Sequence, residues 1–293
     1  MTRRTCQWLQ RAALLGLGLA TFAMPTTAPA DDLASLRPHL TFHASFDEGT
    51  KADFAKGDPA SYIGEEIPPK TSRPGLPAVV SHVAAQGKWG GSLQFKDVSP
   101  KVFFYRGEGN VPYSPQGFDL TVSYWLRLTP EKDLKPGYVD PLQITDKAWN
   151  NAALFCDFND KGEPRLFRLG VMSDLSFWNP KNTDWEKIPD SERPLIVVAQ
   201  HPFRNDQWTH VAFTLQGVNR STPCTSTFYL NGKAQGSRSV QEKFSWNPQQ
   251  LSIMLGIQYI GGMDELAVFD KALTAEEVVQ LMKLDGGVKS LRK

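Results

Sequence analysis

The segment from Gly261 to Met282 (GGMDELAVFDKALTAEEVVQLM) constrains the fold of this chain more than any other. Asp264–Phe269 has β-strand character, and the residues that follow carry the signature of a helix start. Thr274 and Glu277 form a T-x-x-E capping box, in which the hydroxyl and the carboxylate each satisfy a backbone N–H. An apolar stripe at helical spacing comes next, formed by Val278, Leu281, Met282 and Leu284. We therefore expect a strand followed at once by one short amphipathic helix that packs on the rest of the protein.

Short runs with β-strand character fill most of the remaining chain and are separated by Gly, Pro and Asn. The clearest is Asp119–Leu128, where apolar residues alternate with polar ones at the period of a half-buried strand. Asn231-Gly232 directly follows another run and indicates a tight hairpin. The other runs are Leu40–Phe46, Ser92–Phe95, Val102–Tyr105, Ala152–Phe158, Leu166–Val171, Leu195–Ala199, Trp208–Leu215, Ser226–Leu230 and Leu251–Ile257. Many short strands with little helix between them predict a β-sandwich or a barrel.

Residues 1–30 have the features of a secretory signal peptide. Arginines at positions 3, 4 and 11 form a basic front, and the apolar run Ala12–Met24 is too short to span a bilayer comfortably. Ala28-Pro29-Ala30 fits a small-x-small cleavage pattern. We expect cleavage after Ala30 and a secreted or periplasmic protein, with the Sec and twin-arginine routes both open.

The mature chain, residues 31–293, suits one all-β domain with a sizeable core. The leader carries three of the 32 Lys and Arg residues and none of the 31 Asp and Glu residues, which leaves the mature chain a net charge of −2. Nucleic acid is therefore not an expected partner, and no later apolar run is long enough for a transmembrane anchor. The sequence does not indicate an oligomeric state.

Five segments fall in an order that resembles a known family. They are GKWGGSLQF (Gly87–Phe95), FDLTVSYWLRL (Phe118–Leu128), QWTHVAFTL (Gln207–Leu215), STFYLNGKAQG (Ser226–Gly236) and LGIQYIGGMDELAVFDKALTAEEV (Leu255–Val278). Together they are similar to the bacterial laminin-G-like (LamG) domains of the concanavalin A-like lectin/glucanase superfamily, over roughly residues 40–284. The resemblance implies an antiparallel jelly-roll β-sandwich, with its first and last strands adjacent and a short C-terminal helix. The irregular stretch from Asp146 to Asp206 departs from the compact family pattern.

The superfamily includes glycoside hydrolases, so a catalytic acid pair would mark the chain as an enzyme. A retaining glucanase needs two carboxylates about 5–5.5 Å apart, which usually appear on one strand as E-x-D-x-x-E. This sequence has no such segment. Asp264 and Glu265 are adjacent, and on a regular strand they point to opposite faces. We therefore expect no catalytic residues and no enzyme, with a hydrolase that uses an atypical acid pair as the alternative.

Calcium is the cofactor that the acidic strand ends would suit, and domains similar to this one often bind it. Asp47 and Glu48 end the first strand, and Asp264 and Glu265 lie in the last one. If these strands are antiparallel neighbours, the two acidic pairs come together and offer the oxygen ligands that Ca²⁺ prefers. The alternative is that these acids hold backbone N–H groups and bind no metal.

Ligand binding is expected in the irregular loops between Asp146 and Asp206. Trp149, Trp178 and Trp185 lie there beside amides or acids, a mixture that suits sugar rings, although the same indoles could cover the sandwich core. The small negative charge favours neutral sugars over polyanions. We predict a non-enzymatic lectin-like module that binds glycan or another extracellular ligand, or else an adhesive or structural surface module that recognises protein.

Two cysteines remain after cleavage, Cys156 in an apolar run and Cys224 in a loop-like segment. Export makes a disulfide between them possible, and two separate buried thiols are the alternative. The sequence leaves both open.

Overall fold

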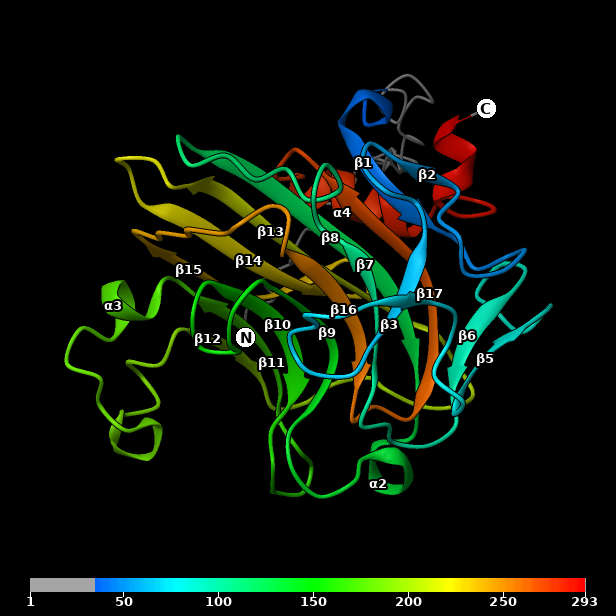
Figure 1. Ribbon diagram of the computed structural model, residues 1–293, viewed down its shortest axis with the longest axis horizontal. Helices are drawn as coiled ribbons and strands as arrows, with labels where there is room; N and C mark the ends of the chain where they lie inside the picture. The colour runs from blue at the N-terminus through cyan, green and yellow to red at the C-terminus, as the bar shows by residue number, and fades with distance from the viewer. Residues whose placement is uncertain (1–34, 293) are drawn as a thin grey trace, which may run out of the picture.

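The computed structural model describes residues 35–292, so the expected signal peptide lies outside the described residues. Two antiparallel sheets face each other (Figure 1). The first has nine strands, in the order β15 (Lys233–Val240), β14 (Cys224–Leu230), β13 (Thr209–Val218), β8 (Phe118–Arg127), β17 (Gly261–Phe269), β1 (Leu40–Ala44) and β2 (Phe54–Ala55), with β6 (Ser92–Phe95) paired to β17 and β5 (Val80–Val83) paired to β6.

The second sheet has eight strands and lies opposite the first. Its order is β12 (Leu195–Val198), β11 (Phe167–Met172), β10 (Ala153–Phe158), β9 (Val139–Thr145), β16 (Ser252–Ile257), β7 (Val102–Arg106), β3 (Ser61–Gly64) and β4 (Arg73–Pro74). The pairing of β1 with β17 places the first and last strands side by side, as the jelly-roll expectation required. The expected antiparallel β-sandwich of the concanavalin A-like type is therefore confirmed.

The main core lies between the two sheets and follows from alternation along each strand. Leu120, Val122 and Tyr124 of β8 point into it, and Leu154 and Cys156 of β10 meet them from the other sheet. Because successive side chains of a strand point to opposite faces, the residues between these positions lie on the outer surface of each sheet. The outer face of β9, β10 and β11 is one such surface.

The outer face of the nine-stranded sheet is covered by the C-terminal segment. Helix α4 (Ala275–Met282) begins at the capping box of Thr274 and Glu277, as predicted, and buries Val278 and Leu281 against this face. The segment before the helix also packs here, since Thr121 donates a hydrogen bond to the Lys271 carbonyl. Strand β8 is therefore buried on both faces, and the expectation of a half-buried strand was wrong because the covering segment is distant in sequence.

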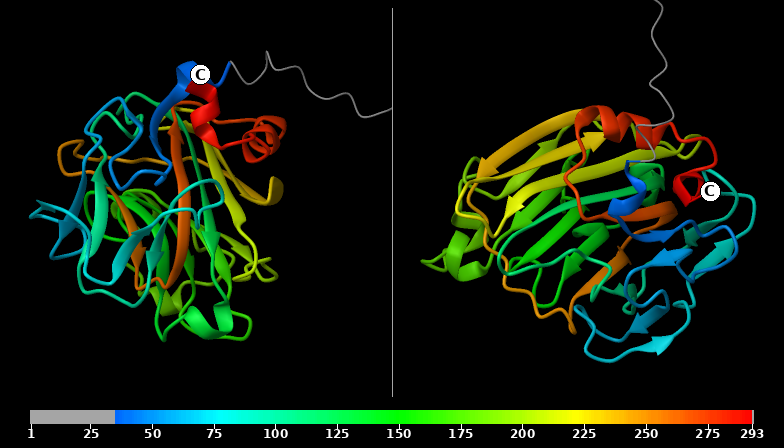
Figure 2. Two further views of the ribbon diagram at one scale, coloured as in Figure 1. Left: turned by 90° about the vertical axis from the view of Figure 1, so that its right-hand side faces the viewer. Right: turned by 90° about the horizontal axis from the view of Figure 1, so that it is seen from above.

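Short helices make up the rest of the regular structure. They are η1 (Arg37–His39), α2 (Pro130–Asp133), α3 (Leu175–Trp178), η2 (Trp185–Lys187) and η3 (Val288–Arg292). Helices α3 and η2 lie in the loop between β11 and β12, which projects from one end of the sandwich, while α4 lies against the nine-stranded sheet (Figure 2). No helix within residues 35–292 is long and apolar enough to cross a membrane.

Cys156 and Cys224 are both buried free thiols, which decides the question that the sequence left open. Burial raises the pKa of each thiol, that of Cys224 to about 12, so both stay protonated and unreactive.

Candidate functional site

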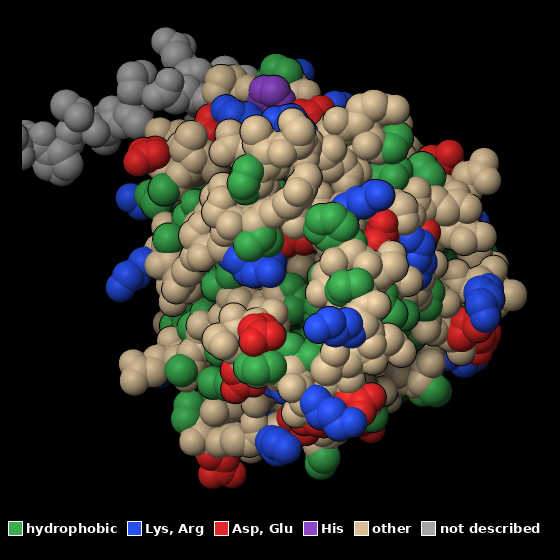
Figure 3. Space-filling model, turned by 90° about the vertical axis from the view of Figure 1, so that its left-hand side faces the viewer, with side chains coloured by type: hydrophobic (Ala, Val, Ile, Leu, Met, Phe, Trp, Pro, Cys, Tyr) green, Lys and Arg blue, Asp and Glu red, His purple; other side chains and the backbone are tan. Residues whose placement is uncertain are grey.

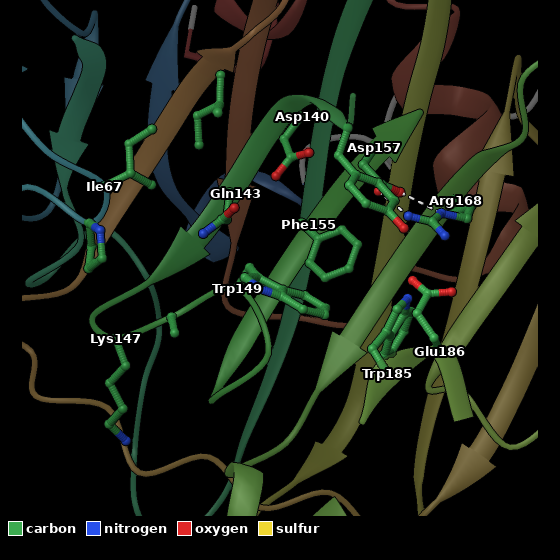
Figure 4. Close-up of a pocket in the computed structure, with 14 residues that line it drawn as sticks. Ile67, Asp140, Gln143, Lys147, Trp149, Phe155, Asp157, Arg168, Trp185 and Glu186 are labelled. Carbon is green, nitrogen blue, oxygen red and sulfur yellow. Dashed lines mark hydrogen bonds and ion pairs between the residues drawn. The ribbon is translucent and has the colours of Figure 1, made fainter. Parts of the chain in front are cut away.

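A groove of about 550 Å³ lies on the outer face of β9, β10 and β11, with the loops at residues 146–151 and 185–186 along its sides (Figure 4). This volume is within the range of small-molecule sites. Each strand contributes outward-pointing residues. On β9 the register shifts between Val139 and Leu142, opposite Phe158 and Cys156 of β10, and this irregularity lets Asp140 and Gln143, three residues apart, face the same groove. Phe155 lies across the neighbouring strand at Gly170, where a Cβ would come within 2.2 Å of its ring. Glycine at this position is what lets an aromatic ring form part of the floor.

The three tryptophans predicted to bind ligand come together at this end of the molecule. The ring centroids of Trp149 and Trp185 are 5.2 Å apart and edge-on, and those of Trp178 and Trp185 are 6.3 Å apart. Trp149 has 43% of its surface exposed and, with Trp185, lines the groove. Trp178 stands behind Trp185 and donates its indole N–H to the carbonyl of Asn150 at 2.9 Å, so it supports the loop and does not line the groove.

A buried ion pair forms the polar floor. Arg168 donates from Nε to Asp157 Oδ1 at 2.9 Å and from Nη2 to Asp157 Oδ2, and both side chains are more than nine-tenths buried. The ring of Tyr138 lies over the guanidinium, 5.2 Å from centroid to carbon. The Nη1 group of Arg168 has no hydrogen-bond partner among the described residues, so two N–H donors remain available to a ligand.

Two further side chains line the groove without partners. Gln143 is 2% exposed, and its amide makes no hydrogen bond to the described part of the chain. Asp140 is half-buried and likewise has no hydrogen-bond partner among residues 35–292. Burial and the neighbouring Asp157 raise the pKa of Asp140 well above its usual range, while Arg168 opposes the rise. The polar atoms of these three side chains are not closed off from solvent, so they open to the cavity and are available there to water or to a ligand.

The rim of the groove carries one basic and one acidic side chain. Lys147 contributes its alkyl stem, since its ammonium group points away from the groove in Figure 4 and donates to the Ser245 carbonyl at 2.6 Å. The same group also lies 3.5 Å from Asp174. Glu186 is exposed and makes no ion pair within the described residues. Away from the groove, acidic and basic side chains are intermixed on the surface shown in Figure 3.

The acids predicted to bind calcium lie on the opposite sheet, where β1 and β17 pair. Asp47 accepts a hydrogen bond from the Gly91 amide at 3.1 Å and pairs with the Lys289 ammonium. Asp264 accepts from the amides of Lys88 at 2.5 Å and of Glu265 at 2.9 Å. These carboxylates therefore hold backbone N–H groups and a lysine, which is the alternative that the sequence analysis named.

Glu265 and Glu48 behave differently from each other. Glu265 is buried, lies 3.2 Å from His43 Nε2 and accepts from the Val288 amide at 2.8 Å, whereas Glu48 is exposed. A bulge at Asp264–Ala267 and a positive φ of 53° at Glu265 break the regular strand, so the expectation of strict alternation was wrong here. Within residues 35–292, no three His, Cys, Asp or Glu side chains are grouped as a metal site requires. Lys289 pairs with Asp47, so a calcium ion at these four acids would have to displace that ammonium group.

The polar floor of the groove was not predicted from the sequence. Asp140 and Gln143 lie on β9, a strand that the sequence analysis did not identify, and Asp157 and Arg168 lie on strands that it did. The available signal was charged residues within two apolar runs, ALFCDF and LFRLGV, that pair as neighbours. Charges inside such runs are costly unless they are paired, and Asp157 lies directly opposite Arg168 in the register.

Comparisons with known proteins give the same fold. The laminin G model described as "Concanavalin A-like lectin/glucanases superfamily" matches residues 109–279. The sequence itself matches no curated protein. Domain 4 of AbnA, a GH43 extracellular arabinanase from Geobacillus stearothermophilus solved in complex with arabinotriose, is similar in structure, with a TM-score of 0.52 and 19% identity over 84% of this chain and 98% of that one.

Receptor-binding and other binding domains of toxins are also similar in structure. The binding domain of Paraclostridial Mosquitocidal Protein 1 has a TM-score of 0.51 at 16% identity, with 84% of this chain and 52% of that chain covered. The receptor-binding domain of botulinum neurotoxin type G has a TM-score of 0.52 at 9% identity, with 84% and 51% covered. The chain thus spans about half the length of these toxin chains. Likeness at such low identity shows the fold, and the fold alone does not fix a ligand.

Proposed function

Because this chain belongs to the concanavalin A-like lectin/glucanases superfamily, we propose that it is a non-enzymatic carbohydrate-binding protein whose ligand lies in the groove on β9, β10 and β11. One observation carries the proposal: Gln143, Asp140 and the Nη1 group of Arg168 face the cavity without partners among the described residues, in a groove that Trp149 and Trp185 also line. Sugars present hydroxyl groups at their edges and apolar C–H faces, which this combination of polar floor and aromatic walls complements. The arabinotriose in the similar arabinanase domain supports a sugar ligand.

The test is a glycan array with residues 31–293, run with and without calcium. We expect a defined set of glycans to bind and Trp149→Ala to weaken that binding about tenfold or more, since truncating an aromatic anchor of a binding site typically costs about 2 kcal/mol or more. Trp208→Ala is the matched control, because Trp208 is a half-buried indole stacked on Arg127 outside the groove. If both variants bind as the wild type does, or if no glycan binds, the proposed site is wrong.

Calcium binding at Asp47, Glu48, Asp264 and Glu265 remains a proposal of the sequence, and it requires Lys289 to leave Asp47. A bound ion would stabilise the fold by about 2.7 kcal/mol at a hundredfold excess over its dissociation constant. Melting temperatures with EDTA and with millimolar calcium measure this directly. Identical melting temperatures under the two conditions would contradict calcium binding.

A second function, glycoside hydrolysis with an atypical acid pair, is favoured by Asp140 and Asp157. They lie on neighbouring strands, and the raised pKa of Asp140 beside a carboxylate paired with Arg168 resembles the division of roles between an acid and a nucleophile. We prefer binding because Asp157 is buried and both of its oxygens accept hydrogen bonds from Arg168. New reducing ends released from a bound glycan, and lost in Asp140→Asn, would establish the hydrolase instead.

We also propose that the protein acts outside the cytoplasm, on the strength of the N-terminal sequence described above. Mass spectrometry of the exported protein should find Asp31 as the first residue. An intact N-terminus on the exported protein would contradict this.

A further inference from the structure

We propose that the groove is specific for a sugar that carries a free amino group, with Asp140 as the counter-ion of the ligand's ammonium. The inference rests on the proposed function, carbohydrate binding in this groove, and adds the chemical class of the ligand. It follows from an inventory of the charges that face the cavity and of the rings between them.

The basic side chains of the groove are already engaged. Arg168 forms two hydrogen bonds with Asp157, so these two charges compensate each other. Lys147 directs its ammonium to Ser245 and Asp174, outside the cavity. Arg165, which lies behind the floor, donates to the backbone carbonyls of the neighbouring loops and does not line the groove.

The acidic side chains, in contrast, are not all compensated. Asp140 and Glu186 face the same cavity, and neither forms an ion pair within residues 35–292. Tyr138, the remaining titratable group of the groove, lies over Arg168. The cavity therefore holds more acidic than basic groups available to a ligand. An anionic sugar would place its charge beside Asp140 and Glu186, and a neutral sugar would provide no positive charge to favour ionisation of Asp140.

The aromatic walls favour a cation as well. Tyr138, Trp149 and Trp185 surround the cavity, and the face of an aromatic ring attracts an ammonium group through its quadrupole. An amino sugar offers both parts that this site complements: C–H faces for the indoles and one ammonium for the carboxyl group. Its hydroxyl groups then have Gln143 and Arg168 Nη1 as partners.

The titration of Asp140 agrees with this assignment. Its pKa is raised by burial and by Asp157, which means that the empty groove disfavours the ionised form. A ligand ammonium beside the carboxyl favours ionisation and lowers that pKa. Binding should therefore release a proton, and affinity for the amine should increase as pH rises through the range in which free Asp140 titrates, until the amine itself loses its proton. A neutral ligand that accepts a hydrogen bond from protonated Asp140 would bind more weakly as pH rises.

Isothermal titration calorimetry of residues 31–293 with a β-1,4-linked glucosamine tetramer and its fully N-acetylated form tests the proposal. Acetylation removes the charge and keeps the sugar backbone. We expect the wild type to bind the free amine at least tenfold more tightly, because hydrogen bonds to charged groups contribute about 1.5–3 kcal/mol. Repeating the titration in buffers of different ionisation enthalpy should reveal proton release.

Asp140→Asn should reduce the preference for the amine to within about threefold while leaving the melting temperature unchanged, because Asp140 has no hydrogen-bond or ion-pair partner within residues 35–292 to lose. Asp285→Asn is the matched control: it removes one exposed negative charge outside the groove and should preserve the preference. Glu186→Gln should have a smaller effect than Asp140→Asn, since Glu186 is exposed.

Two outcomes would overturn the inference. If the acetylated tetramer, or a neutral glycan from the array, binds as tightly as the amine and Asp140→Asn changes nothing, the ligand class is wrong while carbohydrate binding stands. If neither tetramer binds, the ligand class is again wrong. The proposal of carbohydrate binding is then contradicted only if no glycan on the array binds either.

Discussion

Two regions of this molecule contain acidic side chains with little or partial exposure, and the regions differ in whether those side chains have hydrogen-bond partners. In the first, the groove on β9, β10 and β11, Asp140 and Gln143 face an open cavity with no hydrogen-bond partner in the described chain. In the second, the covered face of the nine-stranded sheet, which lies under residues 271–292, Glu265 and His43 pair with each other. The polar atoms left over there, Glu265 Oε1 and His43 Nδ1, are closed off from solvent.

The difference separates stability from binding. A partnered buried carboxylate ties elements together, and its removal leaves other groups unsatisfied. A polar group that opens to a cavity can be hydrogen-bonded by water, so it contributes little to stability and is available to a ligand. Substitutions on the covered face should therefore destabilise the fold, whereas substitutions in the groove should alter binding at little or no cost in stability.

The largest effect is expected from removal of the covering segment, Thr274–Lys293. It contributes five buried aliphatic side chains: Val278, Leu281, Leu284, Val288 and Leu291. Each is worth about 1.5–3 kcal/mol, so their sum reaches the whole stability of a typical domain, about 5–15 kcal/mol. The truncated protein should lose its cooperative thermal transition in circular dichroism, and deletion of Lys293 alone should not have this effect. A truncated protein that melts as the wild type does would show that the covered face does not stabilise the fold.

A smaller but clear loss is expected for Glu265→Ala. The substitution leaves the Val288 N–H and His43 without their acceptor in a buried place, at a cost of about 2–5 kcal/mol in the free energy of unfolding. Glu48→Ala, from the same predicted calcium set, removes an exposed carboxylate and should change stability by less than about 0.5 kcal/mol. Urea denaturation of both variants measures the contrast. Equal effects would show that burial of Glu265 does not matter.

The covered face should also make the fold sensitive to acid through His210. Burial, and secondarily Lys88, lower the pKa of His210 to about 3, and its Nε2 lies 2.8 Å from Ser123 Oγ. The ordinary pKa of about 6.5 applies in the unfolded chain, so the contribution of neutral His210 is fully present above that pH and is lost as pH falls toward 3. Between pH 7.5 and 4.5 the wild type should lose about 2–3 kcal/mol more than His210→Gln, measured by urea denaturation. If the wild type and His210→Gln lose the same free energy of unfolding over this pH range, groups other than His210 cause the acid sensitivity.

The sequence predicted the scaffold well because its signals are local. Alternation, the Asn231-Gly232 turn and the capping box of Thr274 and Glu277 each depend on neighbouring residues, and the structure has β-strands, a hairpin and helix α4 at these places. The three loop tryptophans also proved to be neighbours in space. Their division into Trp149 and Trp185 on the groove and Trp178 behind them depends on loop conformation, which no local pattern specifies.

The polar floor was not predictable in the same way. Asp140 and Gln143 lie on β9, whose sequence VDPLQIT contains a proline and little alternation, and their meeting with Arg168 depends on the order of strands in the sheet. The acidic strand ends were predicted to be adjacent because the first and last strands pair, and they do pair. Their partners, Lys289 and the amides of residues 88 and 91, come from distant segments that fold over them, and this was not visible in the sequence.

The most direct test of the central claim, that the groove keeps unsatisfied polar groups for a ligand, is the free energy of unfolding of Gln143→Met. Methionine has a similar length and lacks the amide, which has no hydrogen-bond partner among residues 35–292, so the substitution removes no contact within the described chain. We predict that the variant is at least as stable as the wild type in urea denaturation and binds the glycan identified on the array more weakly. A variant that is less stable by 1 kcal/mol or more, with binding unchanged, would show that Gln143 serves the fold and would contradict the account.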